Sequence, residues 1–418
     1  MISRLRQVVD SEAARLVLAC AVGGAMGVLA WGDGRDAALA ALLPVVLSIC
    51  KSRAQAFLLA TAYLLAVERH IPAFASQWFG GNLGIGLSLT LASCVAGAVG
   101  WSLAWTASGK PWRKAAAILV AWTVTLLPPF AVVTPAHPVI AWGYITPGLK
   151  WLGLILSVAV PAGLVWKMAA MNLSTRRTYG VIGVLAVALV GLSFTYKAVE
   201  NRYVNDIVAI TTNWGSATEP SEILGRIEKV GKTTKKFAEI NPAGVVIYPE
   251  SILYRYDPSF YPVLKAEVLR AAAAAGQTVV LGMDLPSGAH FQTVAVAFYP
   301  NGQTQTALAR QTVPFALWKP WAKQGSFTSN WSESNMLTLR DGVTARIVFC
   351  YEEYMPVLGL ANEVLNDHQI VVVMANTWAN SSDEGAEIQS RHSEGFARLF
   401  GRKLVRAENR PKPPTTTQ

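Results

Sequence analysis

Cys350 is the residue whose position most directly suggests chemistry. It ends the apolar run 345–350, Ala-Arg-Ile-Val-Phe-Cys, and is followed at once by Tyr351-Glu352-Glu353. The other three cysteines lie in the strongly apolar amino-terminal half, so Cys350 has no partner in its own domain and an intradomain disulfide is excluded. A leftover thiol is a candidate nucleophile. The competing interpretation is a buried core cysteine, since free Cys is among the most buried residue types.

Two further groups of polar residues also lie at the end of an apolar run, as Cys350 does. Glu250 ends the apolar stretch 244–250, and Asn376-Thr377-Trp378 follow the apolar stretch 370–375. In sheets built from alternating strands and helices, functional groups gather beyond the carboxyl ends of the strands. The sequence therefore predicts that Glu250, Cys350 and Trp378 lie near one another.

The elements that must position these residues form an alternating pattern. Short β-branched or apolar runs predict strands, and two longer polar stretches at 221–240 and 261–275 predict helices. A Pro-Asn-Gly turn at 300–302 predicts a hairpin. Strands alternating with helices are typical of an α/β domain with buried strands. The predicted strands are 203–213, 244–250, 278–282, 293–299, 345–349 and 370–375.

The amino-terminal half has a different character. The chain of 418 residues is 52% hydrophobic and only 15% charged, and this bias is concentrated before residue 200. Long apolar blocks with charged or Pro/Gly breaks predict about seven membrane spans. The second and third are short, and a re-entrant or interfacial pair is the alternative there. No cleavage site ends the first span, so we do not interpret it as a signal peptide. The spans are placed at 12–31, 36–50, 54–69, 84–107, 114–133, 149–171 and 179–197.

Basic residues in the short loops predict the orientation. Lys51 with Arg53, Lys110 with Lys114, and Arg176 with Arg177 fall in every second loop, as a cytoplasmic amino terminus requires. Seven spans then place residues 200–410 in the periplasm of a bacterial inner-membrane protein. The same basic residues account for much of the net charge of +10, and no nucleic-acid signature is present. The five scattered histidines give no metal-ligand spacing, and no cofactor is predicted.

The predicted loop at 127–148 is rich in proline and aromatic residues. An interfacial aromatic belt with helix-breaking prolines accounts for this composition. The alternative is the wall of a site through which a membrane lipid or another substrate reaches the second domain.

Three motifs now identify a resemblance. Ile247-Tyr-Pro-Glu250-Ser, Val348-Phe-Cys350-Tyr-Glu-Glu and Ala375-Asn-Thr-Trp378 resemble, in order and spacing, the carbon–nitrogen hydrolase (nitrilase) superfamily. The preceding spans resemble its apolipoprotein N-acyltransferase branch, and the size and layout are similar to the conjugal transfer protein TraB family. The specific motifs cover about residues 245–410. The resemblance implies a membrane domain at 1–199, a nitrilase-like α-β-β-α sandwich at 200–410, and a disordered tail at 411–418.

The resemblance also implies a mechanism. In the family a glutamate takes the thiol proton, the thiolate attacks an acyl carbon, and a lysine stabilises the oxyanion. Glu250 would then be the base and Cys350 the nucleophile. An acyl group from a membrane lipid would rest on Cys350 as a thioester before transfer to an amine.

The third residue departs from the family pattern. The segment Ala309-Arg310-Gln-Thr-Val-Pro314-Phe315 places Arg310 near the lysine position, with the spacing shortened by one residue. Leu317 replaces the glutamate that follows in the family. An arginine can stabilise an oxyanion but is not equivalent to lysine in shape or proton donation. Lys319 is the alternative, and a site without a competent third residue is a further one.

Three more residues are supporting candidates. Glu352 and Tyr351 follow the nucleophile, and Trp378 follows the third strand end. Each has a competing interpretation as a solvated or packing residue. The chain ends soon after Asn409 in a Pro/Thr-rich tail, and the last strands and final membrane helix of N-acyltransferases are not found.

Two function classes follow. The first is a membrane-bound thiol acyltransferase or amidase on the periplasmic side, which Glu250 and Cys350 favour. The second is a non-catalytic accessory or assembly protein that keeps the fold and has conjugation-apparatus proteins as its partners, which Arg310 and Leu317 favour.

Overall fold

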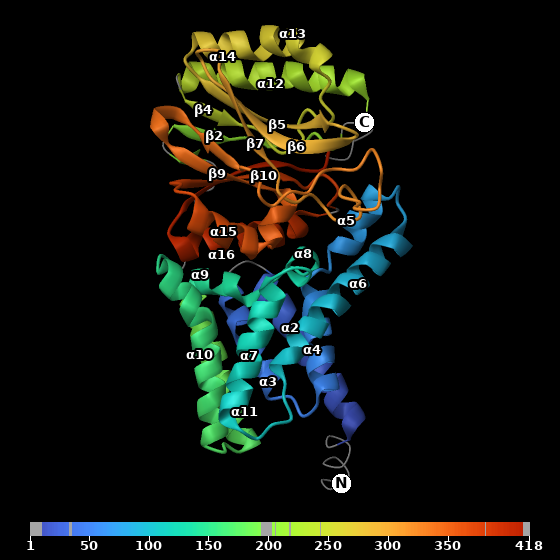
Figure 1. Ribbon diagram of the computed structural model, residues 1–418, viewed down its shortest axis with the longest axis vertical. Coiled ribbons are helices and arrows are strands. Elements are labelled where there is room, and N and C mark those ends of the chain that lie inside the picture. The colour runs from blue at the N-terminus through green and yellow to red at the C-terminus, as the bar shows by residue number, and fades with distance from the viewer. Residues whose placement is uncertain are drawn as a thin grey trace, which may run out of the picture. The chain divides into compact units, whose positions relative to one another are not determined.

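The chain forms two compact units in a computed structural model (Figure 1). The structure describes residues 11–32, 36–193, 203–204, 206–216, 219–242, 244–380 and 382–412. The first unit comprises residues 1–197 together with 354–357 and 382–401. The second comprises residues 198–353, 358–381 and 402–418. The predicted tail lies largely outside the described residues, which end at Lys412.

Helices make up the amino-terminal part of the first unit. They fall on each of the seven apolar blocks identified in the sequence. The helices are α2 (Glu12–Trp31), η1 (Ala37–Leu42), α3 (Leu43–Ser48), α4 (Arg53–Val67), α5 (Ile71–Trp78), α6 (Leu83–Trp101), η2 (Ser102–Ala104), α7 (Pro111–Leu126), α8 (Phe130–Val133), η3 (Pro138–Ala141), α9 (Trp142–Ile145), α10 (Lys150–Ala170) and α11 (Thr175–Ser193).

Three of these segments are long and apolar enough to cross a membrane. They are α2, α6 extended through Ala104, and α10. Helices α4 and α5 are together long and apolar enough to cross a membrane, but they are bent by 61° at the break between them. Helix α5 lies between the third and fourth predicted spans, so this bend does not test the re-entrant alternative for the second and third spans. The count of about seven spans stays a prediction.

Small residues bring two of these helices into close contact. A Cβ atom on Gly23 of α2 would lie 2.1 Å from the carbonyl oxygen of Leu59 in α4, and one on Gly27 would lie 2.5 Å from that of Tyr63. The Gly-x-x-x-Gly spacing therefore allows the backbones of α2 and α4 to approach directly, as small residues do at helix interfaces in membranes.

The Pro-rich segment 127–148 is packed inside this unit. Trp142 and Tyr144 are 5% and 2% exposed, so they face protein and do not form an aromatic belt. Their neighbour is α16 (Asp383–Phe400): Ala136 donates its N–H to Nε2 of His392 at 3.0 Å. A Cβ on Gly143 would lie 1.7 Å from the oxygen of Gly395. The interfacial-belt interpretation is thus wrong, because this segment binds a helix from late in the chain.

The second unit contains two mixed sheets. The six-stranded sheet has the order β1-β2-β4-β5-β6-β7, and the five-stranded sheet has the order β3-β11-β10-β9-β8. The strands are β1 (Tyr203–Val204), β2 (Ile207–Ala209), β3 (Thr211–Thr212), β4 (Val245–Ile247), β5 (Thr278–Ser287), β6 (His290–Phe298), β7 (Thr304–Leu308), β8 (Met336–Thr338), β9 (Thr344–Phe349), β10 (Ile370–Asn376) and β11 (Lys403–Asn409).

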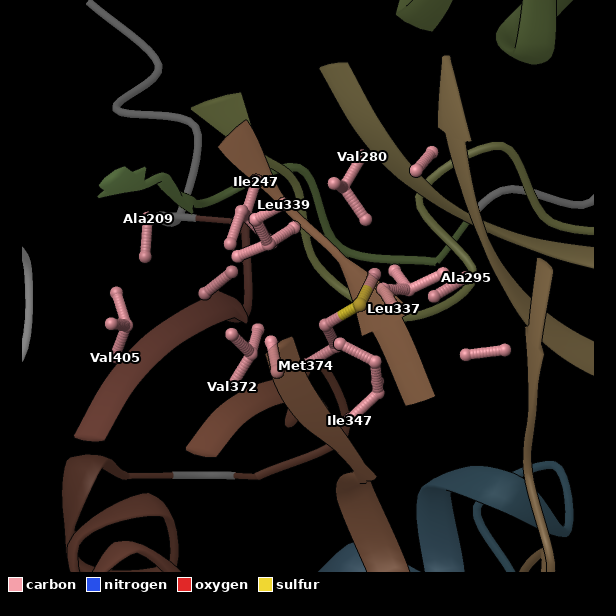
Figure 2. Packing of buried hydrophobic residues seen from close by; sticks show 14 of the residues in the cluster. Ala209, Ile247, Val280, Ala295, Leu337, Leu339, Ile347, Val372, Met374 and Val405 are labelled. Atoms are coloured by element: carbon pink, nitrogen blue, oxygen red, sulfur yellow. The ribbon is translucent and has the colours of Figure 1, made fainter. Parts of the chain in front are cut away.

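Apolar side chains fill the space between the two sheets. Ile247 and Val280 come from the first sheet, and Ile347, Val372 and Val405 come from the second (Figure 2). These residues alternate with others that face outward, as the two-residue period of a strand requires. Strands of the first sheet are buried on both faces, which explains why their sequences are nearly continuous apolar runs.

Helices cover the outer faces. A second apolar core lies between the first sheet and α12 (Pro220–Ile240), α13 (Tyr261–Leu264), η5 (Lys265–Leu269) and α14 (Arg270–Ala274). On the outer face of the second sheet, Arg346 donates from Nη1 to the Gly359 oxygen of α15 (Pro356–Leu365) at 3.3 Å. The predicted α-β-β-α sandwich is therefore confirmed. The hairpin at 300–302 is also confirmed, since it joins β6 to β7.

Candidate active site

Glu250 lies in a tight turn directly after β4. Two residues of this turn, Ser251 and Tyr254, have positive φ angles of 47° and 49°. Gly282 of β5 lies directly against it, because a Cβ there would be 2.6 Å from the Glu250 Cα. Non-glycine residues rarely adopt positive φ unless the surrounding structure holds them there. The turn thus fixes the Glu250 carboxyl group, which is only 6% exposed.

Cys350 follows β9 as the first residue of the short helix η7 (Cys350–Tyr354). Cys350 forms no disulfide with a described residue, and it is 7% exposed. Because β9 and β10 are parallel, Cys350 lies beside the end of β10, where its sulfur is 3.7 Å from the Asn376 oxygen. The carboxyl ends of β9 and β10 therefore lie side by side, as the sequence predicted.

The Cys350 thiol lies close enough to the Glu250 carboxyl group to lower that group's pKa as a hydrogen-bond donor. A thiol carries one proton, so donation to the Glu250 carboxylate and donation to the Asn376 oxygen are alternatives. The carboxylate is placed to take the proton that an attacking sulfur must lose.

Burial raises the pKa of Glu250 well above its ordinary value. The negative charges of Asp284, Glu352 and Glu353 raise it further, and the hydrogen bond from Cys350 opposes this shift. A raised pKa is what a carboxyl group needs in order to act as a base toward a thiol near neutral pH.

Asp284 fastens the Glu250 turn to the first sheet. Its Oδ1 accepts hydrogen bonds from Ser251 at 2.8 Å and from Thr293 at 2.9 Å. Burial nevertheless raises the pKa of Asp284 to about 6. No pattern in the sequence indicates this residue, because its pairing with Ser251 depends on the register of β5.

Glu352 links the nucleophile turn to the segment that carries Arg310. Its Oε1 accepts the backbone N–H groups of Arg310 at 2.5 Å and Gln311 at 3.0 Å, and its Oε2 accepts that of Phe349 at 3.2 Å. Burial raises the pKa of Glu352 to about 7, although the three N–H donors act in the opposite direction. Since the two oxygens accept only, the ionised form fits this arrangement.

A buried ion pair holds the other carboxylate of the same turn. Nη1 of Arg406 on β11 donates to Oε2 of Glu353, and Nη2 is 3.6 Å from Oε1 of Glu408. Burial alone would lower the pKa of Arg406, yet the charges of Glu353, Glu408 and Cys350 raise it above its ordinary value. The Cys350 sulfur is therefore among the groups whose charge Arg406 would interact with.

Arg406 was missing from the predicted site. The available signal was the alternation in Val405-Arg406-Ala407-Glu408, which places two opposite charges on one face of a buried strand.

The Arg310 side chain is buried at 4% exposure. Its Nε donates to the Glu333 oxygen at 2.7 Å, while Nη1 is buried without a hydrogen-bond partner in the described part of the chain. Ala309, which occupies the lysine position by strict spacing, packs in the core between the sheets. The oxyanion role of Arg310 stays a prediction, and its unpaired donor is consistent with that role.

The remaining candidates lie in less defined surroundings. Lys319 is half-buried, and its ammonium forms no ion pair or hydrogen bond with a described residue. Tyr351 and Trp378 are half-buried and adjoin Cys350 and Thr377. Their roles stay predictions. Across the described ranges, no cluster of three or more His, Cys, Asp or Glu residues could hold a metal ion.

Comparison with known proteins gives distant relatives over nearly the whole chain. No family model matches. A probable conjugal transfer protein TraB of Sinorhizobium fredii is 26% identical, with 94% of this chain and 97% of that protein covered. The conjugal transfer protein TraB of Agrobacterium fabrum is also 26% identical, with 94% and 93% covered. The chain is thus a distant, full-length homologue of TraB proteins.

A similar solved structure is that of a CN-hydrolase superfamily protein from Xanthomonas campestris. The sequences are 16% identical, and the TM-score is 0.29 over 41% of this chain and 64% of that chain.

Proposed function

We propose that this distant relative of the TraB proteins is a membrane-bound thiol enzyme that transfers an acyl group during plasmid conjugal transfer. The observation that carries the proposal is the proximity of two buried groups, the Glu250 carboxyl group and the Cys350 thiol, which lowers the pKa of that carboxyl group. The TraB relatives supply the biological setting, and the buried carboxylate–thiol pair supplies the chemistry.

The first half-reaction forms a thioester. Glu250 accepts the S–H proton, and the Cys350 sulfur attacks the carbonyl carbon of an ester or amide. Arg310 Nη1 donates to the oxyanion, while the charge of Arg406 favours the thiolate. When the carbon–oxygen or carbon–nitrogen bond breaks, Glu250 returns the proton to the leaving group.

The second half-reaction transfers the acyl group. An amine, or water in the hydrolytic variant, loses a proton to Glu250 as it attacks the thioester carbon. The carbon–sulfur bond then breaks, and the sulfur recovers the proton from Glu250. Both half-reactions use the same base, so one carboxylate beside one thiol is sufficient.

The membrane unit favours a lipid as the acyl donor. Three helices are long and apolar enough to cross a membrane, and an acyl donor of the phospholipid class is found there. The alternating basic loops support an orientation with the amino terminus in the cytoplasm and the second unit in the periplasm of the inner membrane.

The test is covalent labelling of the full-length protein in detergent micelles. A thiol-directed acyl probe is expected to modify Cys350 in preference to Cys20, Cys50 and Cys94. Cys350→Ser should abolish the adduct, whereas the control Cys94→Ser should not. Equal labelling of all four cysteines, or an adduct that survives Cys350→Ser, would refute the proposal.

A non-catalytic role in assembly of the conjugation apparatus is the second candidate. It is favoured by the Arg310 side chain, whose Nε is held by the Glu333 oxygen, and by Leu317 in place of a glutamate. Plasmid transfer frequency separates the two functions. Cys350→Ser should abolish transfer if acyl transfer is required, and should leave it unchanged if the protein acts only through its partners.

A further inference from the structure

A cavity of about 260 Å³ lies at one end of the helices of the first unit. Its walls come from the end of α3, the beginning of α7, the end of α10 and the beginning of α11 (Figure 1). We propose that this cavity binds the phosphate of an anionic membrane lipid. The inference does not depend on the chemistry proposed for Cys350.

The charge of the lining segments is entirely positive. Segments 48–51, 109–114 and 165–179 contain seven lysine or arginine residues and no aspartate or glutamate. Lys51 and Lys114 line the cavity itself. Neither ammonium forms an ion pair within the described part of the chain. Unpaired cations in a small cavity attract an anionic group.

Neutral donors lie beside these lysines. Thr178 lines the cavity and is 9% exposed, yet its hydroxyl group forms no hydrogen bond to a described residue. Lys114 and Thr178 are in the first turns of α7 and α11. The positive dipole ends of both helices therefore add to the attraction for an anion.

The remaining lining explains why a lipid fits better than free phosphate. Val165, Met168 and Leu173 give the cavity an apolar wall. Trp166 and Tyr179 beside it are 51% and 54% exposed, as is typical of aromatic residues at a membrane–water interface. Basic pockets between membrane helices bind lipid headgroups in this way. The volume suits a headgroup and leaves the acyl chains outside.

The experiment measures lipid retention by native mass spectrometry. The full-length protein in detergent is titrated with phosphatidylglycerol or phosphatidylcholine. The pocket variant Lys51→Gln/Lys114→Gln is compared with the control Lys110→Gln/Lys167→Gln, which removes the same charge from exposed residues outside the lining. The pocket variant should retain phosphatidylglycerol about thirtyfold less well, and the control should change by less than about threefold.

Further experiments identify the source of the phosphate and the role of the Thr178 hydroxyl group. Thr178→Val keeps the side-chain shape and should weaken retention severalfold with unchanged thermal unfolding. Equal losses in the pocket and control variants would indicate diffuse attraction and overturn the proposal. The lipid assignment would also be wrong if inorganic phosphate displaced phosphatidylglycerol at equal concentration, or if both lipids were retained equally.

Discussion

Three buried carboxyl groups in the second unit, those of Glu250, Asp284 and Glu352, all have raised pKa values. A group whose pKa is higher in the folded state binds its proton more tightly there. Folding stability contributed by such a group is present at low pH and is lost as pH rises towards the folded pKa. The site therefore costs stability at neutral pH, as functional sites often do.

Glu250→Gln should separate stability from reactivity. The variant keeps the side-chain shape but cannot ionise, so its melting temperature should exceed that of the wild type at pH 8. The difference should shrink as pH falls towards 4.5, the ordinary pKa of a glutamate, because Glu250 is then protonated in the folded state and half protonated in the unfolded state. Labelling of Cys350 should fall on the order of a hundredfold and lose its rise with pH. Thermal unfolding and labelling rates measured from pH 4.5 to 8 test this, and a variant that labels normally would contradict it.

Arg310 tests the departure from the family pattern. If Nη1 donates to the oxyanion, Arg310→Lys should preserve or increase turnover, and Arg310→Ala should lower it on the order of a hundredfold. Lys319→Ala is the matched comparison, and it should have little effect if Arg310 is the stabiliser. Single-turnover rates of probe hydrolysis distinguish the two. A large loss in Lys319→Ala alone would transfer the role to that lysine.

At the scale of elements, the site depends on how closely β5 approaches the turn after β4. The hydrogen bond from Leu253 N–H to the Gly282 oxygen is 3.3 Å, and Tyr248 donates to Val280 at 2.9 Å. Between these bonds, only a residue without a Cβ leaves space for the Glu250 backbone. The base is thus positioned by a neighbouring strand as much as by its own.

Gly282→Ala should damage the site through this contact. A Cβ would lie 2.2 Å from the Pro249 oxygen, so the Glu250 turn must move. We expect a stability loss of about 1–3 kcal/mol together with slower labelling of Cys350. Gly225→Ala in α12 is the control, because nothing lies within 4 Å of its new methyl group. Denaturant unfolding and labelling measure both effects, and normal labelling in a folded Gly282→Ala would contradict the argument.

Sequence reasoning placed Glu250 and Cys350 together because strand carboxyl ends can be read from apolar runs. It could not place Asp284, Gly282 or Arg406, because their contacts depend on strand register and on which strands are neighbours. The predicted strand 203–213 also serves both sheets: β2 pairs with β4, and β3 pairs with β11. Local patterning carries no information on such a switch between sheets.

At the scale of the whole molecule, the topology rests on alternating basic loops. A reporter that is active only in the periplasm should be active when fused after Asn409 and silent when fused near Arg176. Fusions of a cytoplasm-specific reporter at both positions provide the control and should give the reverse pattern. A silent fusion after Asn409 together with an active one near Arg176 would place Cys350 in the cytoplasm.

The interleaving of the two units also affects how the protein is made. The chain leaves the second unit at residue 382 to supply α16 to the first, and then returns at residue 402 to add β11. Arg406 and the rest of β11 are therefore synthesised after Cys350 and the other strands of the second unit. Cys350 is synthesised well before the cation that favours its thiolate. A nascent chain that ends before Arg406, or a chain cut between α16 and β11, would thus carry its Cys350 thiol without that charge.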